Sequence, residues 1–203
     1  EMLEILRKDY VKQHKNDKDF EAYVSSLKSQ EKQQELQKHL QETMINEDIE
    51  LFTMEDLDGK KVDLSKMEGK IIVLDFWATW CAPCKASLPG MQMAVNKFKN
   101  DPNVAFFFIS TMETAANFKE QIRKFMKEHN YTLQVLCDNV NPKTKKQSAV
   151  YDTYCKAFKF SGIPHKMIID GNGKLRWSIG GYMGSPSALA EEMNLMIEML
   201  KAE

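Results

Sequence analysis

Two largely apolar runs of strand length stand in the middle of the chain, at residues 71–77 and 104–110. A strand that is apolar on both faces must be covered on both faces, which is typical of parallel strands in α/β proteins. The segments between and after these runs space their apolar residues by three and four, as amphipathic helices do. The pattern therefore predicts an α/β domain with a central mixed sheet flanked by helices.

The remaining patterns continue this alternation of helix and strand. Ser185 followed by Pro186 fits a helix N-cap with proline at the first helical position. Gly171-Asn172-Gly173 fits a hairpin turn, so we expect the first strands to be parallel and the last pair antiparallel. The predicted elements are a hairpin within about 49–64, helices at about 82–99, 114–129, 147–159 and 186–202, and strands at about 132–137, 166–170 and 174–179.

The first part of the chain differs from the rest. Residues 1–46 contain no Gly and no Pro, are rich in Lys, Glu and Gln, and space their apolar residues as a helix does. Asn16 and Asp17 are expected to cap a second helix. We therefore predict a helical N-terminal arm or linker at 1–46 and a domain at 47–203. The arm is either a solvated lead-in, which the thin apolar stripe favours, or a homodimerisation arm.

Composition limits the kinds of partner and environment that the sequence supports. The chain carries 28 basic and 29 acidic residues, so no electrostatic argument favours nucleic acid, and we predict no nucleic-acid partner. No run approaches the 18 or so apolar residues of a membrane span. No motif points to a cofactor or a resident metal, and we predict neither. Because the chain does not open on Met, we expect a processed chain or a fragment, tethered through a region upstream.

The chemistry is concentrated in Cys81-Ala82-Pro83-Cys84, directly after the first apolar strand. Cys81 is expected at a helix N-terminus, where backbone N–H groups and the helix dipole favour a thiolate. Cys84 follows one turn into the helix, a spacing that suits a disulfide that forms and reopens. A zinc site would need a second Cys-x-x-Cys. A structural staple over so short a ring would restrict the unfolded chain very little.

Two further residues support a redox pair. Asp75 lies inside the apolar run, where burial raises the pKa of a carboxyl, and it could accept the proton of Cys84 through a water. The alternative is an Asp at a strand edge that faces solvent. Pro164 follows Gly162-Ile163 and opens a strand, which makes it a candidate for a cis peptide bond.

The other sulfur atoms have simpler interpretations. Cys137 ends a predicted strand and Cys155 lies on the apolar face of a predicted helix. Buried free thiols are the favoured interpretation, and a second disulfide in an oxidising compartment is the alternative. The methionines of the last helix alternate with Leu and Ile and indicate core packing rather than a copper site.

Trp80 and the Cys-Ala-Pro-Cys motif, Asp75 and Ile163-Pro164, in this order of strands, resemble the thioredoxin superfamily over residues 47–203. The leading hairpin, the Phe-Trp-Ala-Thr-Trp-Cys segment and Lys166-Met-Ile-Ile-Asp resemble the bacterial thiol-disulfide oxidoreductases of the TlpA/ResA type. That resemblance implies a thioredoxin-like fold. It also implies a location in the periplasm or cell envelope, and protein clients whose disulfides are reduced or exchanged.

The resemblance also implies roles for individual residues. Cys81 resembles the attacking cysteine, Cys84 the resolving cysteine and Pro89 a proline that kinks the active-site helix. The implied catalytic residues are Cys81, Cys84, Asp75 and Pro164. The predicted substrate-binding residues are Trp80, Pro83, His165 and Ile163, whose backbone would pair with an extended client segment.

Three positions qualify the resemblance. Several cytochrome-maturation members carry Glu where this chain has Ser87, which weakens a cytochrome-specific assignment. Asp75 and Ile163 match thioredoxin proper more closely than the exported relatives, which favours the reducing direction.

The sequence thus predicts a thiol-disulfide oxidoreductase that acts on exported protein clients and is recharged by an upstream thiol electron donor. The alternative is a module that delivers a soft metal, copper, through the same two thiols. A peroxidase of the same superfamily is disfavoured, because those proteins usually place Thr ahead of a single peroxidatic Cys.

Overall fold

The computed structural model describes residues 2–203. The chain divides into two compact units, one that ends at Thr43 and one that spans Met44–Glu203. The division lies close to the border predicted from composition. Across the described residues no helix combines the length and apolar character needed to cross a membrane.

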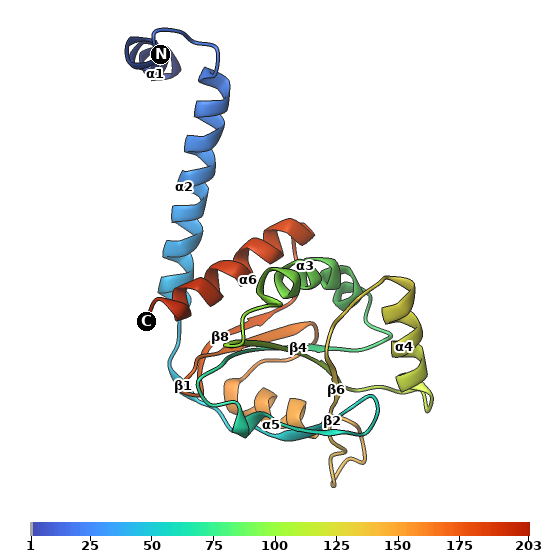
Figure 1. The fold of residues 1–203 in the computed structure, drawn as a ribbon. Helices are drawn as coiled ribbons and strands as arrows, with labels where there is room; N and C mark the ends of the chain where they lie inside the picture. The colour runs from blue at the N-terminus through green and yellow to red at the C-terminus, as the bar shows by residue number, and fades with distance from the viewer. Residues whose placement is uncertain (1) are drawn as a thin grey trace. The chain divides into compact units, whose positions relative to one another are not determined.

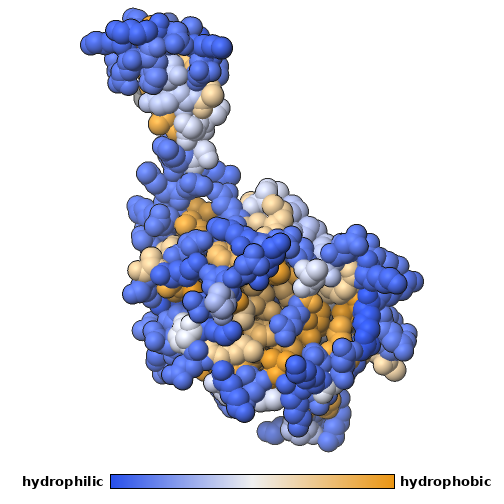
Figure 2. Space-filling model, in the orientation of Figure 1, coloured by the Kyte–Doolittle hydropathy of each residue, from blue (hydrophilic) through white to orange (hydrophobic). Residues whose placement is uncertain are grey.

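The N-terminal unit consists of two helices, α1 (Met2–His14) and α2 (Phe20–Thr43). Asn16 Oδ1 accepts the Lys18 N–H at 3.1 Å in the break between them, where the sequence predicted a helix start. The Tyr10 ring of α1 lies 4.9 Å, centroid to centroid, from an α2 ring, Tyr23. The surface of both helices is mainly hydrophilic (Figure 2), in keeping with their thin apolar stripe.

The second unit is built on one sheet (Figure 1), in which the described strands follow the order β1-β8-β7-β4-β5-β6-β2-β3. β4, β5 and β6 are parallel, whereas β7 and β8 form an antiparallel hairpin beside β4, so both predictions of strand direction are confirmed. The bounds are β1 Glu47–Asp48, β2 Thr53–Asp56, β3 Lys61–Asp63, β4 Ile71–Trp77, β5 Val104–Ser110, β6 Val135–Cys137, β7 His165–Ile169 and β8 Lys174–Gly180.

Helices cover both faces of this sheet. α3 and α6 pack against each other on one face, and α5 lies on the other (Figure 1). The predicted α/β layers are therefore confirmed, as is the leading hairpin, formed by β2 and β3. The bounds are a short 3-10 helix Leu64–Lys66, α3 Ala82–Phe98, α4 Phe118–Glu128, α5 Ala149–Phe158 and α6 Pro186–Lys201.

Several elements are shorter than the sequence predicted, and for two of them the hydrogen bonds show the reason. β6 begins at Val135 rather than 132, because the Thr132 N–H donates to the Gln92 side chain at 2.8 Å instead of to the sheet. α4 begins at Phe118 rather than 114, after a turn in which the Phe118 N–H donates to the Ala115 carbonyl. Side-chain and turn hydrogen bonds of this kind leave no periodic signal in a sequence.

The two faces of β4 have different neighbours. The Phe76 ring contacts Tyr151 and Tyr154 of α5, and belongs to the main hydrophobic core. The Trp77 ring lies 6.2 Å, centroid to centroid, from Phe125 of α4. Because side chains alternate along a strand, Asp75 shares the face of Trp77 and points away from the α5 core. This alternation brings a carboxyl to the α3 side of the sheet.

The contact between α3 and α6 depends on Gly90. A Cβ atom at this position would lie 2.5 Å from the Pro186 carbonyl oxygen of α6. We expect Gly90→Ala to lower the free energy of unfolding by about 1–3 kcal/mol through overpacking, although Ala is the better helix former. Urea denaturation measures this loss. Ala86→Gly, at an exposed position of α3, is the control and reports the contribution of helix propensity alone. A gain in stability in Gly90→Ala would contradict the close contact with Pro186.

Candidate active site

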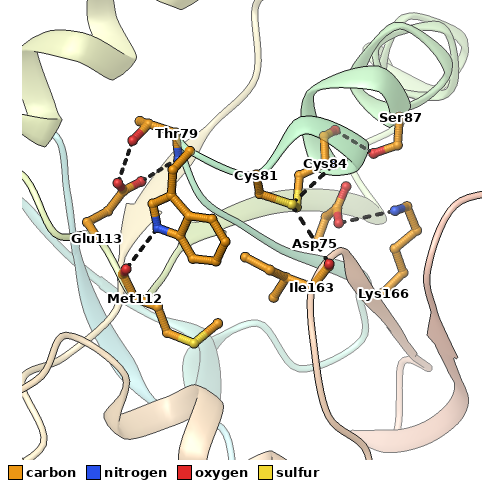
Figure 3. Close-up of a disulfide and its surroundings, with 10 residues drawn as sticks. Asp75, Thr79, Cys81, Cys84, Ser87, Met112, Glu113, Ile163 and Lys166 are labelled. Atoms are coloured by element: carbon orange, nitrogen blue, oxygen red, sulfur yellow. Dashed lines mark hydrogen bonds and ion pairs between the residues drawn. A yellow bond between two sulfur atoms is a disulfide. The ribbon is translucent and has the colours of Figure 1, made fainter.

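The two cysteines of the motif lie where β4 passes into α3. They form a disulfide, with Cα atoms 5.3 Å apart, and Cys81 is the N-cap residue of the helix. The Cys84 N–H donates to the Cys81 sulfur at 3.2 Å (Figure 3). A helix N-terminus presents unpaired N–H groups and the positive end of the dipole, so the reduced Cys81 sulfur is favoured as a thiolate.

The prolines of the motif region suit this helix. Pro83 is exposed in the first turn of α3, where a missing N–H costs no hydrogen bond. Pro89 lies inside α3, and the helix continues past it to Phe98, as the resemblance implied.

The loop before Cys81 is fixed by a carboxylate from another loop. Glu113 accepts the Thr79 N–H at 2.8 Å and the Thr79 hydroxyl at 2.6 Å (Figure 3). It also accepts the Ser110 hydroxyl at 2.9 Å. The adjacent Met112 carbonyl accepts the indole N–H of Trp80 at 3.0 Å. These bonds tie the segment that carries the cysteines to the end of β5.

Trp80 forms an exposed apolar surface beside the disulfide. Its side chain is 53% exposed, although its ring nitrogen is bonded, so the ring is both held in place and open to solvent. An aromatic ring in this state can contact a protein client at little cost in side-chain entropy. The placement suits the predicted substrate-binding role of Trp80.

The segment before β7 approaches the disulfide from the other side. The peptide bond between Ile163 and Pro164 is cis. The Ile163 carbonyl oxygen lies 3.8 Å from the Cys81 sulfur (Figure 3). The fold thus brings together two segments that lie 82 residues apart in the chain.

Asp75 lies in the interior below α3, not at a solvent-facing strand edge. Its carboxyl faces Lys166 of β7, whose ammonium nitrogen is 3.3 Å from Asp75 Oδ1, and both side chains are 1% exposed (Figure 3). Burial raises the pKa of Asp75, and the charge of Lys166 opposes this effect. A carboxyl with a raised pKa is suited to accept and release a proton.

His165 occupies a different place from the one that its sequence position suggested. The ring is 2% exposed, stacks on Phe160 at 3.5 Å between centroids, and places Nε2 2.8 Å from the Ser178 hydroxyl. A buried ring offers no surface to a client, so the structure gives no support to a substrate-binding role for His165. Burial, with the nearby Lys166 charge, lowers the pKa of His165 to about 4.

The remaining candidate residues are accounted for within the domain. Ser87 is buried, and its hydroxyl donates to the Cys84 carbonyl at 2.8 Å. Cys137 and Cys155 are free, as favoured from the sequence, and burial raises the pKa of both thiols. Among the described residues, no group of three or more His, Cys, Asp or Glu side chains is arranged to hold a metal ion.

Sequence reasoning missed two residues of this site. Lys166 carried a usable signal, since it is a charged residue between a proline and an apolar strand run. Glu113 carried none, because its partners lie on a loop that only the folded sheet brings near.

Comparison with known proteins identifies the family. A family model described as AhpC/TSA family matches residues 45–178. The chain belongs to this family. It is 32% identical over 145 residues to the thiol-disulfide oxidoreductase ResA of Bacillus subtilis (strain 168), a match that covers 71% of this chain and 72% of the relative.

Two further comparisons agree. A ResA protein of Bacillus cereus is 29% identical over 61% of this chain and 62% of its own length. The crystal structure of a thiol:disulfide interchange protein from Chlorobium tepidum TLS superimposes with a TM-score of 0.59 at 21% identity, covering 77% of this chain and 97% of that one. The predicted thioredoxin-like fold and the prediction of a thiol-disulfide oxidoreductase are confirmed.

The Glu113 contacts predict a local contribution to stability. Glu113→Ala leaves the Thr79 N–H and two hydroxyl groups without their acceptor, and we expect a loss of about 1–3 kcal/mol in the free energy of unfolding. Urea denaturation measures the loss, and iodide quenching of tryptophan fluorescence reports the release of the loop, because Trp80 is exposed whereas Trp77 and Trp177 are buried. Glu120→Ala, at an exposed position of α4, is the matched control. Equal stabilities of the two variants would show that Glu113 does not hold the loop.

The buried His165 predicts a pH dependence of stability. Its pKa falls from 6.5 to about 4 on folding, so between these values the unfolded chain binds a proton that the folded protein does not. This contribution is complete above pH 6.5 and is lost as the pH falls toward 4. We expect the drop in stability from pH 7 to pH 4.5 to be smaller in His165→Gln than in the native protein, by about 2 kcal/mol.

Urea denaturation at the two pH values measures this difference. His129→Gln is the control, because His129 is exposed on the surface. The same drop in His165→Gln as in the native protein would contradict a neutral buried imidazole.

Proposed function

We propose that this protein reduces or exchanges disulfides of protein clients through the Cys81–Cys84 pair. The observation that carries the proposal is the disulfide at the N-terminus of α3, with the Ile163 carbonyl 3.8 Å from the Cys81 sulfur. One arrangement thus supplies a sulfur favoured as a thiolate, a second thiol within one helical turn, and backbone next to the sulfur for a client to pair with.

The first step is attack by the Cys81 thiolate on one sulfur of a client disulfide. A bond forms between Cys81 and that sulfur, the client S–S bond breaks, and the other client sulfur leaves as a thiolate that solvent protonates. Ile163 and Trp80 flank the place where the client chain must lie. The extended client segment pairs with the Ile163 backbone, and Trp80 and Pro83 cover its side chains.

The second step is resolution of the mixed disulfide. The Cys84 thiol gives its proton to Asp75, and its sulfur attacks Cys81 and displaces the client as a second thiolate. Two electrons have then passed from Cys81 and Cys84 to the client. A dithiol donor from outside the chain must reduce the Cys81–Cys84 disulfide before the next cycle.

The direction of exchange and the compartment belong to this proposal. Asp75 and Ile163, which match thioredoxin proper, support the reducing direction. The resemblance of the sequence motifs to the bacterial TlpA/ResA-type oxidoreductases supports action on proteins outside the cytoplasm, in the cell envelope. Dimerisation through α1 and α2, and delivery of copper by the two thiols, stay predictions. Sedimentation of the purified chain tests dimerisation. The copper content of protein prepared without chelator tests metal delivery.

Single-cysteine variants test the proposed order of attack. We expect Cys84→Ser to accumulate a mixed disulfide with oxidised insulin, because Cys81 still attacks but nothing resolves the product. Cys81→Ser should form none. Non-reducing electrophoresis detects the adduct, and dithiothreitol should release it. Adducts of equal yield in both variants would contradict the assignment of Cys81 as the attacking residue.

The reduction potential tests the direction. Equilibration with dithiothreitol or glutathione redox buffers should give a value near that of thioredoxin, about −270 mV. A value near −120 mV, at the oxidising end of the range, would make the protein a disulfide donor. Absence of a reversible couple would remove the enzyme assignment itself.

A further inference from the structure

The β4–β7 strand pair places one cation directly against the buried carboxyl of the site. Asp75 and Lys166 are paired across the two antiparallel strands and point to the same face of the sheet. Lys166 Nζ lies 3.3 Å from Asp75 Oδ1, and both side chains are 1% exposed. Among the described residues, neither the Asp75 oxygens nor Lys166 Nζ has a hydrogen-bond partner beyond this contact.

The other groups around Asp75 supply no competing charge. From α3, the cysteine pair carries no charge in the disulfide form, the Cys84 thiol is the proton donor in the step considered, and the Ser87 hydroxyl donates to the helix backbone. From β7, the neighbouring His165 alternates to the opposite face and stacks on Phe160. β5 places Phe108 beside Asp75 in the sheet. The charge state of Asp75 is therefore set by burial on one side and by Lys166 on the other.

These two influences act in opposite directions. Removal from water favours the protonated carboxyl and raises the pKa of Asp75, whereas an ammonium in direct contact favours the carboxylate. A carboxyl that is already protonated cannot accept the proton of Cys84. Burial alone thus acts against the proposed base, because it favours the protonated carboxyl.

We propose that Lys166 is a positioning residue, one that holds the Asp75 carboxyl below the disulfide in its ionised form so that it accepts the Cys84 proton. This proposal rests on the function proposed above. In the step concerned, the S–H bond of Cys84 breaks, its proton passes to an Asp75 oxygen, and the Cys84 electron pair forms the S–S bond with Cys81. The Cys81–client bond breaks, and the client leaves as a thiolate.

The position of Lys166 in the chain adds to this argument. It lies two residues after the cis-proline, on the strand that follows Ile163 and Pro164. Asp75 lies on the strand that leads into Cys81. The ion pair thus joins the strand that follows the proposed client-binding segment to the strand that leads to the attacking cysteine.

The test measures the resolving step alone. The reduced protein is mixed with 5,5′-dithiobis(2-nitrobenzoate); one thionitrobenzoate leaves, and the other stays bonded to Cys81 as a mixed disulfide and becomes coloured only when it is released as a thiolate. The release of that thiol by Cys84 is followed in a stopped-flow instrument from pH 5 to pH 10. The variants are Lys166→Met, Asp75→Asn, the double variant, and the control Lys174→Met, which removes an exposed ion pair with Asp48 from the same hairpin.

We expect the pH–rate inflection of Lys166→Met to move about 1–3 pH units toward alkaline values, which is the effect of removing an adjacent opposite charge. At pH 7 release should slow by about tenfold or more. Asp75→Asn should lose this inflection and keep only the alkaline rise that ionisation of the Cys84 thiol by solvent produces. The double variant should match Asp75→Asn, and Lys174→Met should match the native protein.

Other outcomes separate the two proposals. An unshifted profile in Lys166→Met, with the inflection lost in Asp75→Asn, would overturn the role of Lys166 and leave the proposed function intact. An unchanged profile in Asp75→Asn would overturn both the role of Lys166 and the proton step of the mechanism. Failure of the native protein to release the thiol at all would overturn the proposed function.

A second measurement needs no variant, should Lys166→Met fail to fold. In the native protein labelled with carbon-13, the Asp75 carboxyl and the Lys166 ε-carbon are titrated together by NMR. A coupled pair shows the same midpoint in both resonances. A Lys166 resonance that does not respond where Asp75 titrates would overturn the proposal.

Discussion

Strand β4 is the constraint on which the rest of the structure depends. It is buried on both faces along its whole length, so helices must cover the sheet above and below, and its end fixes where α3 begins. One carboxyl, Asp75, interrupts its apolar sequence and is tolerated because β7 supplies Lys166 opposite it. The same strand therefore specifies the layers of the fold, the position of Cys81 at the helix N-terminus, and the buried acid below it.

Much of this arrangement could be predicted because it is local. The apolar runs, the helix after the cysteines and the N-cap at Ser185 each depend on residues within a few positions of one another. Asp75 and Pro164 were recognisable for the same reason, since each breaks the pattern of its own strand. These features could be predicted because the residues that cause each of them lie in the same segment of the chain.

The rest could not be predicted because it depends on contacts between distant segments. His165 is adjacent to Pro164 in sequence, yet strand alternation turns its ring into the α5 side of the sheet, against Phe160. Glu113 binds the Thr79 loop only because β4 and β5 end side by side. Lys166 was visible as an unusual charge, but its partner became known only from the register of β4 against β7.

The site places opposite electrostatic conditions on its two sulfur atoms. Cys81 receives the N–H groups and dipole of α3, which favour a thiolate without a nearby base. Cys84 is fully buried one turn later, where burial disfavours its thiolate. In the proposed mechanism it therefore requires a base when it attacks. A single buried carboxylate meets that requirement only while it is charged, and a neutral interior opposes that charge. A buried carboxylate that serves as a base therefore needs a positive charge in contact with it. In the proposed mechanism Lys166, on the strand that follows Pro164, supplies this charge.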